Sequence, residues 1–203
     1  MNFLAHCLVA DRASSSDSMV IAGGVIGEFV KGRVPQNWPE GLITGVRLHR
    51  RLDAFSNQLA SLKTSANRFP AELRRFAPIF VDIVADHCLA RQWHAQSDEP
   101  VTEFSARCYQ AIEPHRGLVS ERDVSFLNWM FERDLLAGYA DWTTVERALH
   151  SITRRLNRSD LNTQVSLVVQ HQLEDFEADF AVYFPELLGH ATKWVEDLST
   201  MAP

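Results

Sequence analysis

The chain has 203 residues, of which 46% are hydrophobic, and a formal net charge of -6. This length is typical of one domain with a sizeable core, and the negative charge disfavours nucleic acid as a general partner. No apolar run approaches the roughly 18 residues of a membrane helix, and the opening MNFLAHCLVADR lacks the pattern of a signal peptide. We therefore predict a single domain over residues 1–203 that is cytoplasmic and has no membrane contact.

Polar stretches divide the chain into segments whose apolar residues recur three and four positions apart, which is the spacing of helices. In chain order, the predicted breaks are SSSDS at 14–18, GRVPQNWPEG at 32–41, RFP at 68–70, QSDEP at 96–100, EPHRG at 113–117 and YADWT at 139–143. No alternating run of convincing length predicts a strand. The predicted fold class is all-α, a single-domain bundle of about seven or eight helices.

Two apolar stripes carry much of this prediction. The first stripe consists of Leu48, Leu52, Phe55, Leu59 and Leu62. The second stripe consists of Val165, Val168, Val169, Leu173, Phe176, Phe180 and Phe184. Each stripe indicates a helix face that is turned toward the core.

Charged residues accompany the apolar face of two predicted helices, where an uncompensated charge is costly. His49 and Asp53 are four residues apart in LHRRLDAF, and Asp86 and His87 are adjacent in VDIVADHCLA, while His6 lies in the apolar NFLAH. Imidazoles and carboxylates from several facing helices can complete a metal coordination shell that one helix cannot. The alternative is a core histidine satisfied by a hydrogen bond, with Asp86 as partner of His87, and a local surface pair of His49 with Asp53. Spacing alone does not choose between these interpretations.

The three cysteines are Cys7, Cys88 and Cys108. They are odd in number, far apart and form no CxxC pair, which argues against a disulfide framework or a thiolate zinc site. We expect reduced thiols that fill space in the core.

Basic residues are concentrated in one part of the chain. Between Phe29 and Arg75 there are three acidic residues and nine basic ones, namely Lys31, Arg33, Arg47, Arg50, Arg51, Lys63, Arg68, Arg74 and Arg75. Such asymmetry suggests a basic face that could steer an acidic partner. Solvated helix faces without a partner are the alternative.

Four motifs together resemble a known family. MNFLAH at the start, EFVKG at 28–32, HRRLD at 49–53 and DIVADH at 82–87 resemble, in order and approximate spacing, the acyl carrier protein phosphodiesterases. The likeness continues more weakly through RRLNR at 154–158 and FEADFAVYFPEL at 176–187. The resemblance implies a helical fold related to the HD phosphohydrolases and a manganese-dependent hydrolysis. The bond cleaved would be the phosphodiester between 4'-phosphopantetheine and a serine of holo acyl carrier protein, leaving the apo protein and free phosphopantetheine.

The resemblance also implies roles for individual residues. The metal, Mn²⁺ or another divalent cation such as Mg²⁺, would be held directly or indirectly by His6, Glu28, Asp53, Asp86 and His87. Position 28 is usually aspartate in the family, and the longer glutamate could shift the metal or reach it through water. Arg50 or Arg51 would bind the phosphoryl group, because the planar guanidinium suits phosphate oxygens. His49 would protonate the departing serine oxygen or bind the phosphate.

The basic segment would then dock the substrate, because acyl carrier proteins are small and acidic. The predicted docking residues are Lys31, Arg33, Arg47, Arg68, Arg74 and Arg75. Two other functions stay open: a nucleotide phosphohydrolase on a similar helical scaffold, and a non-catalytic helical module that binds acidic proteins. The sequence contains no Walker loop, GxGxxG or nucleophile elbow.

Overall fold

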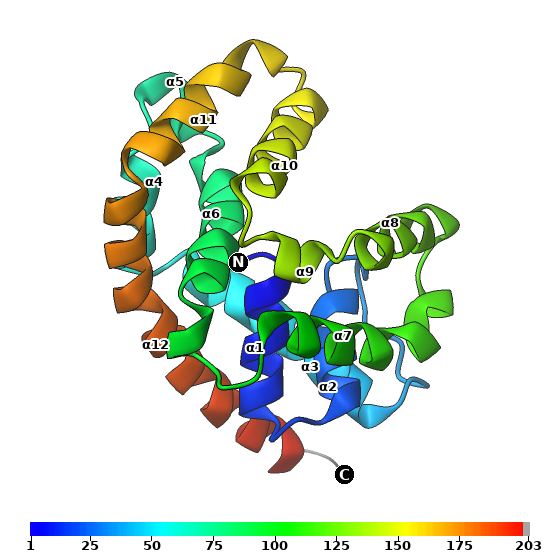
Figure 1. The fold of residues 1–203 in the computed structure, drawn as a ribbon. Helices are drawn as coiled ribbons and strands as arrows, with labels where there is room; N and C mark the ends of the chain where they lie inside the picture. Colours follow the sequence, from blue (N-terminus) through cyan, green and yellow to red (C-terminus); the bar gives the residue numbers. More distant parts are fainter. Residues whose placement is uncertain (201–203) are drawn as a thin grey trace.

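The computed structural model describes the backbone of residues 1–200 and the side chains through residue 197, and this part of the chain is helical without a strand (Figure 1). Its α-helices are α1 Phe3–Ala13, α2 Ser18–Ile26, α3 Glu40–Ser56, α4 Ala60–Asn67, α5 Ala71–Arg74, α6 Ala77–Arg91, α7 Val101–Ile112, α8 Glu121–Glu132, α9 Leu135–Gly138, α10 Trp142–Arg155, α11 Asn162–His171 and α12 Leu173–Thr200. Three short 3-10 helices join them, η1 Trp93–Ala95, η2 Glu113–Leu118 and η3 Ser159–Leu161. The predicted all-α class is confirmed.

The number of helices is higher than the seven or eight predicted, since twelve α-helices lie within residues 1–200. Two of them, α5 and α9, are single turns, and both apolar stripes are interrupted. α3 ends at Ser56, where the hydroxyl of Ser56 and the amide of Asn57 both donate to the carbonyl of Asp53. Such side-chain hydrogen bonds compete with the backbone hydrogen bonds of the helix, and α3 ends here. The buried Leu59 nevertheless continues the apolar spacing beyond the end of the helix. The second stripe is broken at Gln172, between α11 and α12.

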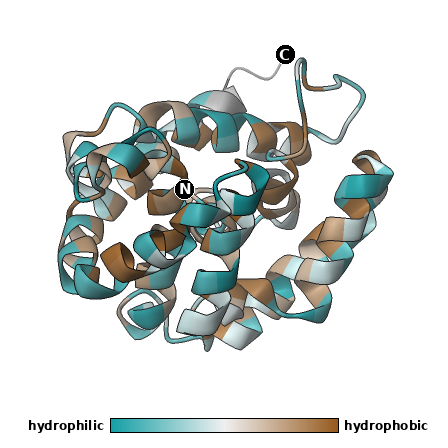
Figure 2. Cartoon of the chain, turned by 90° about the horizontal axis from the view of Figure 1, so that it is seen from above, coloured by the Kyte–Doolittle hydropathy of each residue, from teal (hydrophilic) through white to brown (hydrophobic). Residues whose placement is uncertain are grey.

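α1 lies in the middle of the molecule, in contact with α2, α6 and α12. Every residue from Leu4 to Ala10 is buried, as expected for a helix that is surrounded by others. Figure 2 shows the N-terminus with helices around it in this view, and several of these helices carry hydrophobic residues. The start of the chain, which contains the candidate ligand His6, is therefore held in the core.

Glycines allow α2 and α3 to pack unusually closely. A Cβ atom on Gly45 would lie 2.3 Å from the carbonyl oxygen of Val20 and 2.7 Å from Cα of Gly23. A Cβ atom on Gly27 would lie 2.7 Å from Cγ of His49. No side chain fits into either contact, so the two backbones approach directly and the imidazole of His49 rests on α2's C-terminal end.

All three cysteines are buried and free, which confirms the prediction of unpaired thiols in the core. Among the described residues, no helix has both the length and the apolar character needed to cross a membrane.

Candidate metal centre

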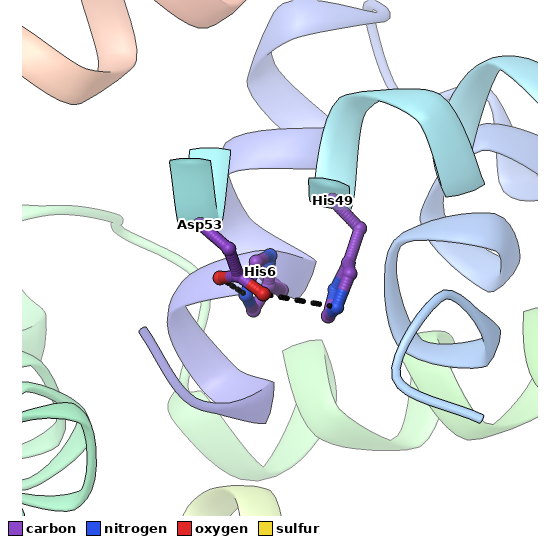
Figure 3. Close-up of side chains that lie close together, drawn as sticks. All are labelled: His6, His49 and Asp53. Carbon is purple, nitrogen blue, oxygen red and sulfur yellow. Dashed lines mark hydrogen bonds and ion pairs between the residues drawn. The ribbon is translucent and has the colours of Figure 1, made fainter. Parts of the chain in front are cut away.

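Three of the predicted site residues converge: His6 from α1, and His49 and Asp53 from α3 (Figure 3). Nε2 of His6 is 3.1 Å from Oδ1 of Asp53, and Nε2 of His49 is 3.3 Å from Oδ2 of the same carboxylate. The two imidazole rings stack with their centroids 4.0 Å apart. One potential ligand atom from each of the three residues lies within 4.8 Å of the others. We call these three residues the His6/His49/Asp53 cluster.

The hydrogen bond of His49 determines which ring nitrogen faces this cluster. Its Nδ1 lies 2.9 Å from the carbonyl oxygen of Gly24, so Nδ1 carries the proton and donates it. Burial, reinforced by the nearby His6, lowers the pKa of His49 to about 3, which leaves the ring neutral at physiological pH. Its Nε2 lone pair then faces Oδ2 of Asp53 and, at 3.7 Å, Oε2 of Glu28. Nε2 of His49 thus lies close to two carboxylate oxygens, and these three atoms could hold a cation.

His6 supports the same conclusion, because its Nδ1 is buried without a hydrogen-bond partner among the described residues. A buried polar atom that lacks a partner costs roughly 1–3 kcal/mol, a cost that is tolerated at functional sites. Burial raises the pKa of Asp53, but the hydrogen bond and charge of His6 outweigh it and hold that pKa below its usual range. Asp53 is therefore an anion at all physiological pH values. Two imidazoles and one or two carboxylates match the donor set that divalent transition metals accept.

Glu28 lies at the open edge of the cluster, with its side chain half exposed. Burial raises the pKa of Glu28, and the charges of Lys31 and Arg155 oppose this. Lys31 also donates from Nζ to the carbonyl of Glu28 at 2.7 Å. Arg155, at the end of α10, was not singled out from the sequence; the only signal for it is its place in the RRLNR motif.

A further charge at the cluster comes from the α-amino group of Met1, which is buried. Its nitrogen lies 2.8 Å from Oδ1 of Asp82 and 3.6 Å from Oδ1 of Asp53. Asp82, for which the sequence offered no specific partner, thus pairs with Met1. No sequence pattern marks this contact, since it depends on where the first turn of α1 is placed.

Asp86 occupies a different position, at the N-terminus of α1. Its two carboxylate oxygens accept hydrogen bonds from the backbone N–H groups of Leu4, at 2.8 Å, and Ala5, at 3.0 Å. Asn2, which precedes the helix, makes no side-chain cap of its own. Burial raises the pKa of Asp86 to about 7, although these two backbone bonds lower it. Asp86, which lies on α6, therefore caps the N-terminus of α1 and helps to position His6 on that helix.

His87 also has a partner outside the cluster. Its Nδ1 donates to the carbonyl oxygen of Tyr139 at 2.7 Å, and its ring meets the ring of Trp142 edge-on, with centroids 6.0 Å apart. Burial lowers the pKa of His87. This geometry corresponds to the core histidine considered above, with a backbone carbonyl rather than Asp86 as its hydrogen-bond partner.

The two arginines of the HRRLD motif point in different directions. Arg50 donates from Nη2 to the carbonyl of Val30 at 2.8 Å, and so ties α3 to the segment that carries Glu28. Arg51 is exposed and lies two residues from both His49 and Asp53, about 200° around α3 from each. Arg51 therefore lies on the face of α3 opposite to the cluster.

The predicted docking residues separate into groups. Arg68 forms a bidentate pair with Asp179 and lies 3.1 Å from Asp175, so its charge is compensated within the chain. Figure 1 shows α5, which contains Arg74, at the opposite end of the view from the segment between α2 and α3. That segment carries Lys31 and Arg33, while Arg75 directly follows α5 and Arg47 is exposed on α3. The basic stretch of sequence is thus not one continuous surface.

Comparison with known proteins agrees with the sequence motifs. A family model described as acyl carrier protein phosphodiesterase matches residues 1–187. Curated relatives include the acyl carrier protein phosphodiesterases of Escherichia coli strains K12 and SMS-3-5, each 27% identical over 194 residues, which is 95% of this chain and 98% of each relative. No solved structure matches the chain, so the expected relation to the HD phosphohydrolases stays a prediction.

Proposed function

Because the chain belongs to the acyl carrier protein phosphodiesterase family, we propose that it hydrolyses the phosphodiester between 4'-phosphopantetheine and a serine of holo acyl carrier protein. The products are apo carrier protein and free 4'-phosphopantetheine. This makes the chain a phosphoric diester hydrolase. We place the reaction in the cytoplasm, as expected from the sequence.

The observation that carries the proposal is the neutral Nε2 of His49 facing the carboxylates of Asp53 and Glu28. Together with His6, these residues are the proposed holders of a divalent cation, Mn²⁺ or Mg²⁺. Such an ion offsets the negative charge of a phosphodiester and makes hydroxide available near neutral pH. A site of this kind suits phosphodiester hydrolysis better than a binding-only protein, which has no need to bury a bare acceptor such as Nδ1 of His6.

The other polar residues near the candidate metal centre receive the following roles. His49 is neutral and its Nε2 has no proton to give, so we assign it to the cation rather than to protonation of the departing serine oxygen. Arg50 uses one guanidinium nitrogen on Val30 and has further N–H groups for the phosphoryl oxygens. Arg155 adds positive charge near Glu28, which lowers the pKa of that carboxyl. Arg51, on the opposite face of α3, has no part in this assignment.

The test is the mass of purified holo acyl carrier protein after incubation with this protein and Mn²⁺. We expect loss of the phosphopantetheine mass with the wild type and none in chelator or with Asp53→Asn. Asp160→Asn is the matched control, since Asp160 is an exposed carboxylate that pairs with the nearby Arg158, and this variant should be as active as the wild type. An unchanged mass with folded protein and several metals would overturn the proposal, as would activity that survives Asp53→Asn and chelator.

A further inference from the structure

The single helical turn α9 connects α8 to α10 and lies against α1 (Figure 1). It begins after Asp134, whose backbone is left-handed with φ of 44° and whose side chain accepts a hydrogen bond from the N–H of Ala137. A left-handed residue other than glycine is uncommon, although aspartate tolerates this conformation better than most residues do. Tyr139 directly follows the turn and is only 2% exposed. The turn thus carries the side chain of Tyr139 into the core.

Tyr139 forms hydrogen bonds with two other parts of the chain. Its backbone carbonyl accepts a hydrogen bond from Nδ1 of His87 on α6, at 2.7 Å. Its hydroxyl oxygen accepts a hydrogen bond from the side-chain amide of Asn2, the residue that precedes α1. A buried tyrosine hydroxyl usually has such a partner. His87 therefore fixes the backbone of Tyr139, and the hydroxyl of Tyr139 fixes Asn2.

The side chain of Asn2 can make this contact because another residue caps α1. An asparagine at this position usually accepts hydrogen bonds from the N–H groups of the first helical turn. In this structure those N–H groups donate to Asp86, and Asn2 makes no side-chain cap. The adjacent residues Asp86 and His87 thus hold the start of α1 in two ways, Asp86 directly and His87 through Tyr139.

Asn2 is linked in turn to the candidate metal centre. Its backbone carbonyl accepts a hydrogen bond from the N–H of His6 at 3.1 Å, which closes the first turn of α1. Nε2 of His6 lies 3.1 Å from Oδ1 of Asp53, so a shift of this turn would change the distance between two proposed metal ligands. Metal affinity depends on the groups that orient the ligands as well as on the ligands themselves.

We propose that Tyr139 is a positioning residue of the metal centre, which orients His6 through Asn2. This rests on the proposed function, in which His6 helps to hold a divalent cation. Loss of the Tyr139 hydroxyl leaves the amide of Asn2 without its acceptor, so the first turn of α1 is held less firmly while every proposed ligand is kept. The YADWT segment, which the sequence marked only as a break between helices, thus contains a residue that acts on the site.

The experiment is isothermal titration of the metal-free protein with Mn²⁺. We expect Tyr139→Phe and Asn2→Ala each to weaken Mn²⁺ binding about tenfold relative to the wild type. Both substitutions remove the same contact, so the double variant should bind no more weakly than the weaker single variant. Losses that multiply in the double variant would show that the two residues act independently, and would overturn the proposal.

Tyr109→Phe is the matched control. The hydroxyl of Tyr109 on α7 accepts a hydrogen bond from the backbone N–H of Leu136 at 2.9 Å, so this variant also removes a tyrosine hydroxyl that contacts the α9 region. It should lower stability and leave the Mn²⁺ affinity unchanged. An equal loss of affinity in Tyr109→Phe would mean that any weakening of α9 disturbs the site, and the specific role of Tyr139 would be wrong.

Visible absorption of the Co²⁺-loaded proteins adds a readout of ligand geometry, which a general loss of stability does not change. We expect an altered spectrum for Tyr139→Phe and the wild-type spectrum for Tyr109→Phe. Unchanged affinity and spectrum in folded Tyr139→Phe would overturn the proposal; if that variant does not fold, Asn2→Ala decides in the same way. A wild type that binds no Mn²⁺ would remove the metal centre and this proposal together. A negative hydrolysis assay alongside the expected titrations would remove the proposed function alone.

Discussion

At the scale of single residues, the neutral imidazole of His49 makes stability depend on pH. Burial lowers its pKa from the ordinary value of 6.5 to about 3 in the folded chain, so between these values the unfolded chain binds a proton that the folded chain does not. Stability is therefore fully present above about pH 6.5 and falls as the pH drops toward 3, with a slope of at most about 1.4 kcal/mol per pH unit from this group. Asp53, whose pKa is also depressed, adds a loss below about pH 4.

We expect urea unfolding in chelator to show a smaller loss of stability between pH 7 and pH 5 for His49→Gln than for the wild type. Asp86, with its raised pKa, has the opposite dependence, but it is present in both proteins and cancels in the comparison. His171→Gln, at an exposed position, should keep the wild-type slope. Equal slopes for all three proteins would contradict the neutral state of His49.

Asp86 is the second residue whose role can be measured. Asp86→Ala would leave the buried N–H groups of Leu4 and Ala5 without acceptors, which should lower the free energy of unfolding by roughly 2–4 kcal/mol. Asp141→Ala removes a comparable cap, of α10, at an exposed site, and about 1 kcal/mol is expected there. Chemical denaturation of both variants gives the comparison. If Asp86→Ala costs no more than Asp141→Ala while abolishing manganese binding, Asp86 serves the metal rather than the helix.

At the scale of elements, the glycine contact between α2 and α3 sets the distance between Glu28 and His49. Gly45→Ala would push the new methyl group into the carbonyl of Val20, so we expect a loss of roughly 1–3 kcal/mol in stability and weaker metal binding as His49 moves away from α2. Gly189→Ala is the matched control: Gly189 also lies inside a helix but has open space around it, and alanine should stabilise α12 by roughly 0.5–1 kcal/mol. Thermal unfolding distinguishes the two, and a neutral Gly45→Ala would show that the helices can separate without cost.

At the scale of the whole molecule, the distribution of charge decides where an acidic substrate docks. Lys31 donates to the carbonyl of Glu28 at the candidate metal centre, and Arg33 borders the same hollow as Lys31, whereas Arg74 and Arg75 lie at and after α5. We expect Lys31→Glu with Arg33→Glu to lower kcat/KM for holo carrier protein about tenfold at low salt, mainly through slower association. Arg74→Glu with Arg75→Glu reverses the same number of charges and should change it little. The reverse order of effects would place the docking surface at α5.

Much of the fold could be predicted from the sequence, because the apolar spacing that indicates a helix is contained within a short segment of the chain. The all-α class and the buried free cysteines follow from residue types and their spacing, and both are confirmed. The number of helices was underestimated, because apolar residues such as Leu59 keep their spacing across a turn when both helices face one core. The turn itself depends on Ser56 and Asn57 bonding to Asp53, a short-range competition that periodicity does not reveal.

The sequence by itself determined the family, the helical class and the candidate residues His6, His49 and Asp53. Motifs and the spacing of apolar residues are read along the chain and do not require knowledge of how the helices pack. Only the tertiary structure decided which candidates meet. It brought His6 from α1 against α3, placed Asp86 on the N-terminus of α1 and His87 on Tyr139, and separated the segment of Lys31 and Arg33 from α5 with Arg74. The reason is that a charge beside an apolar stripe needs a buried partner, and several are chemically acceptable: a cation, a backbone amide or a carbonyl. Which one it meets depends on helix packing between residues far apart in the chain.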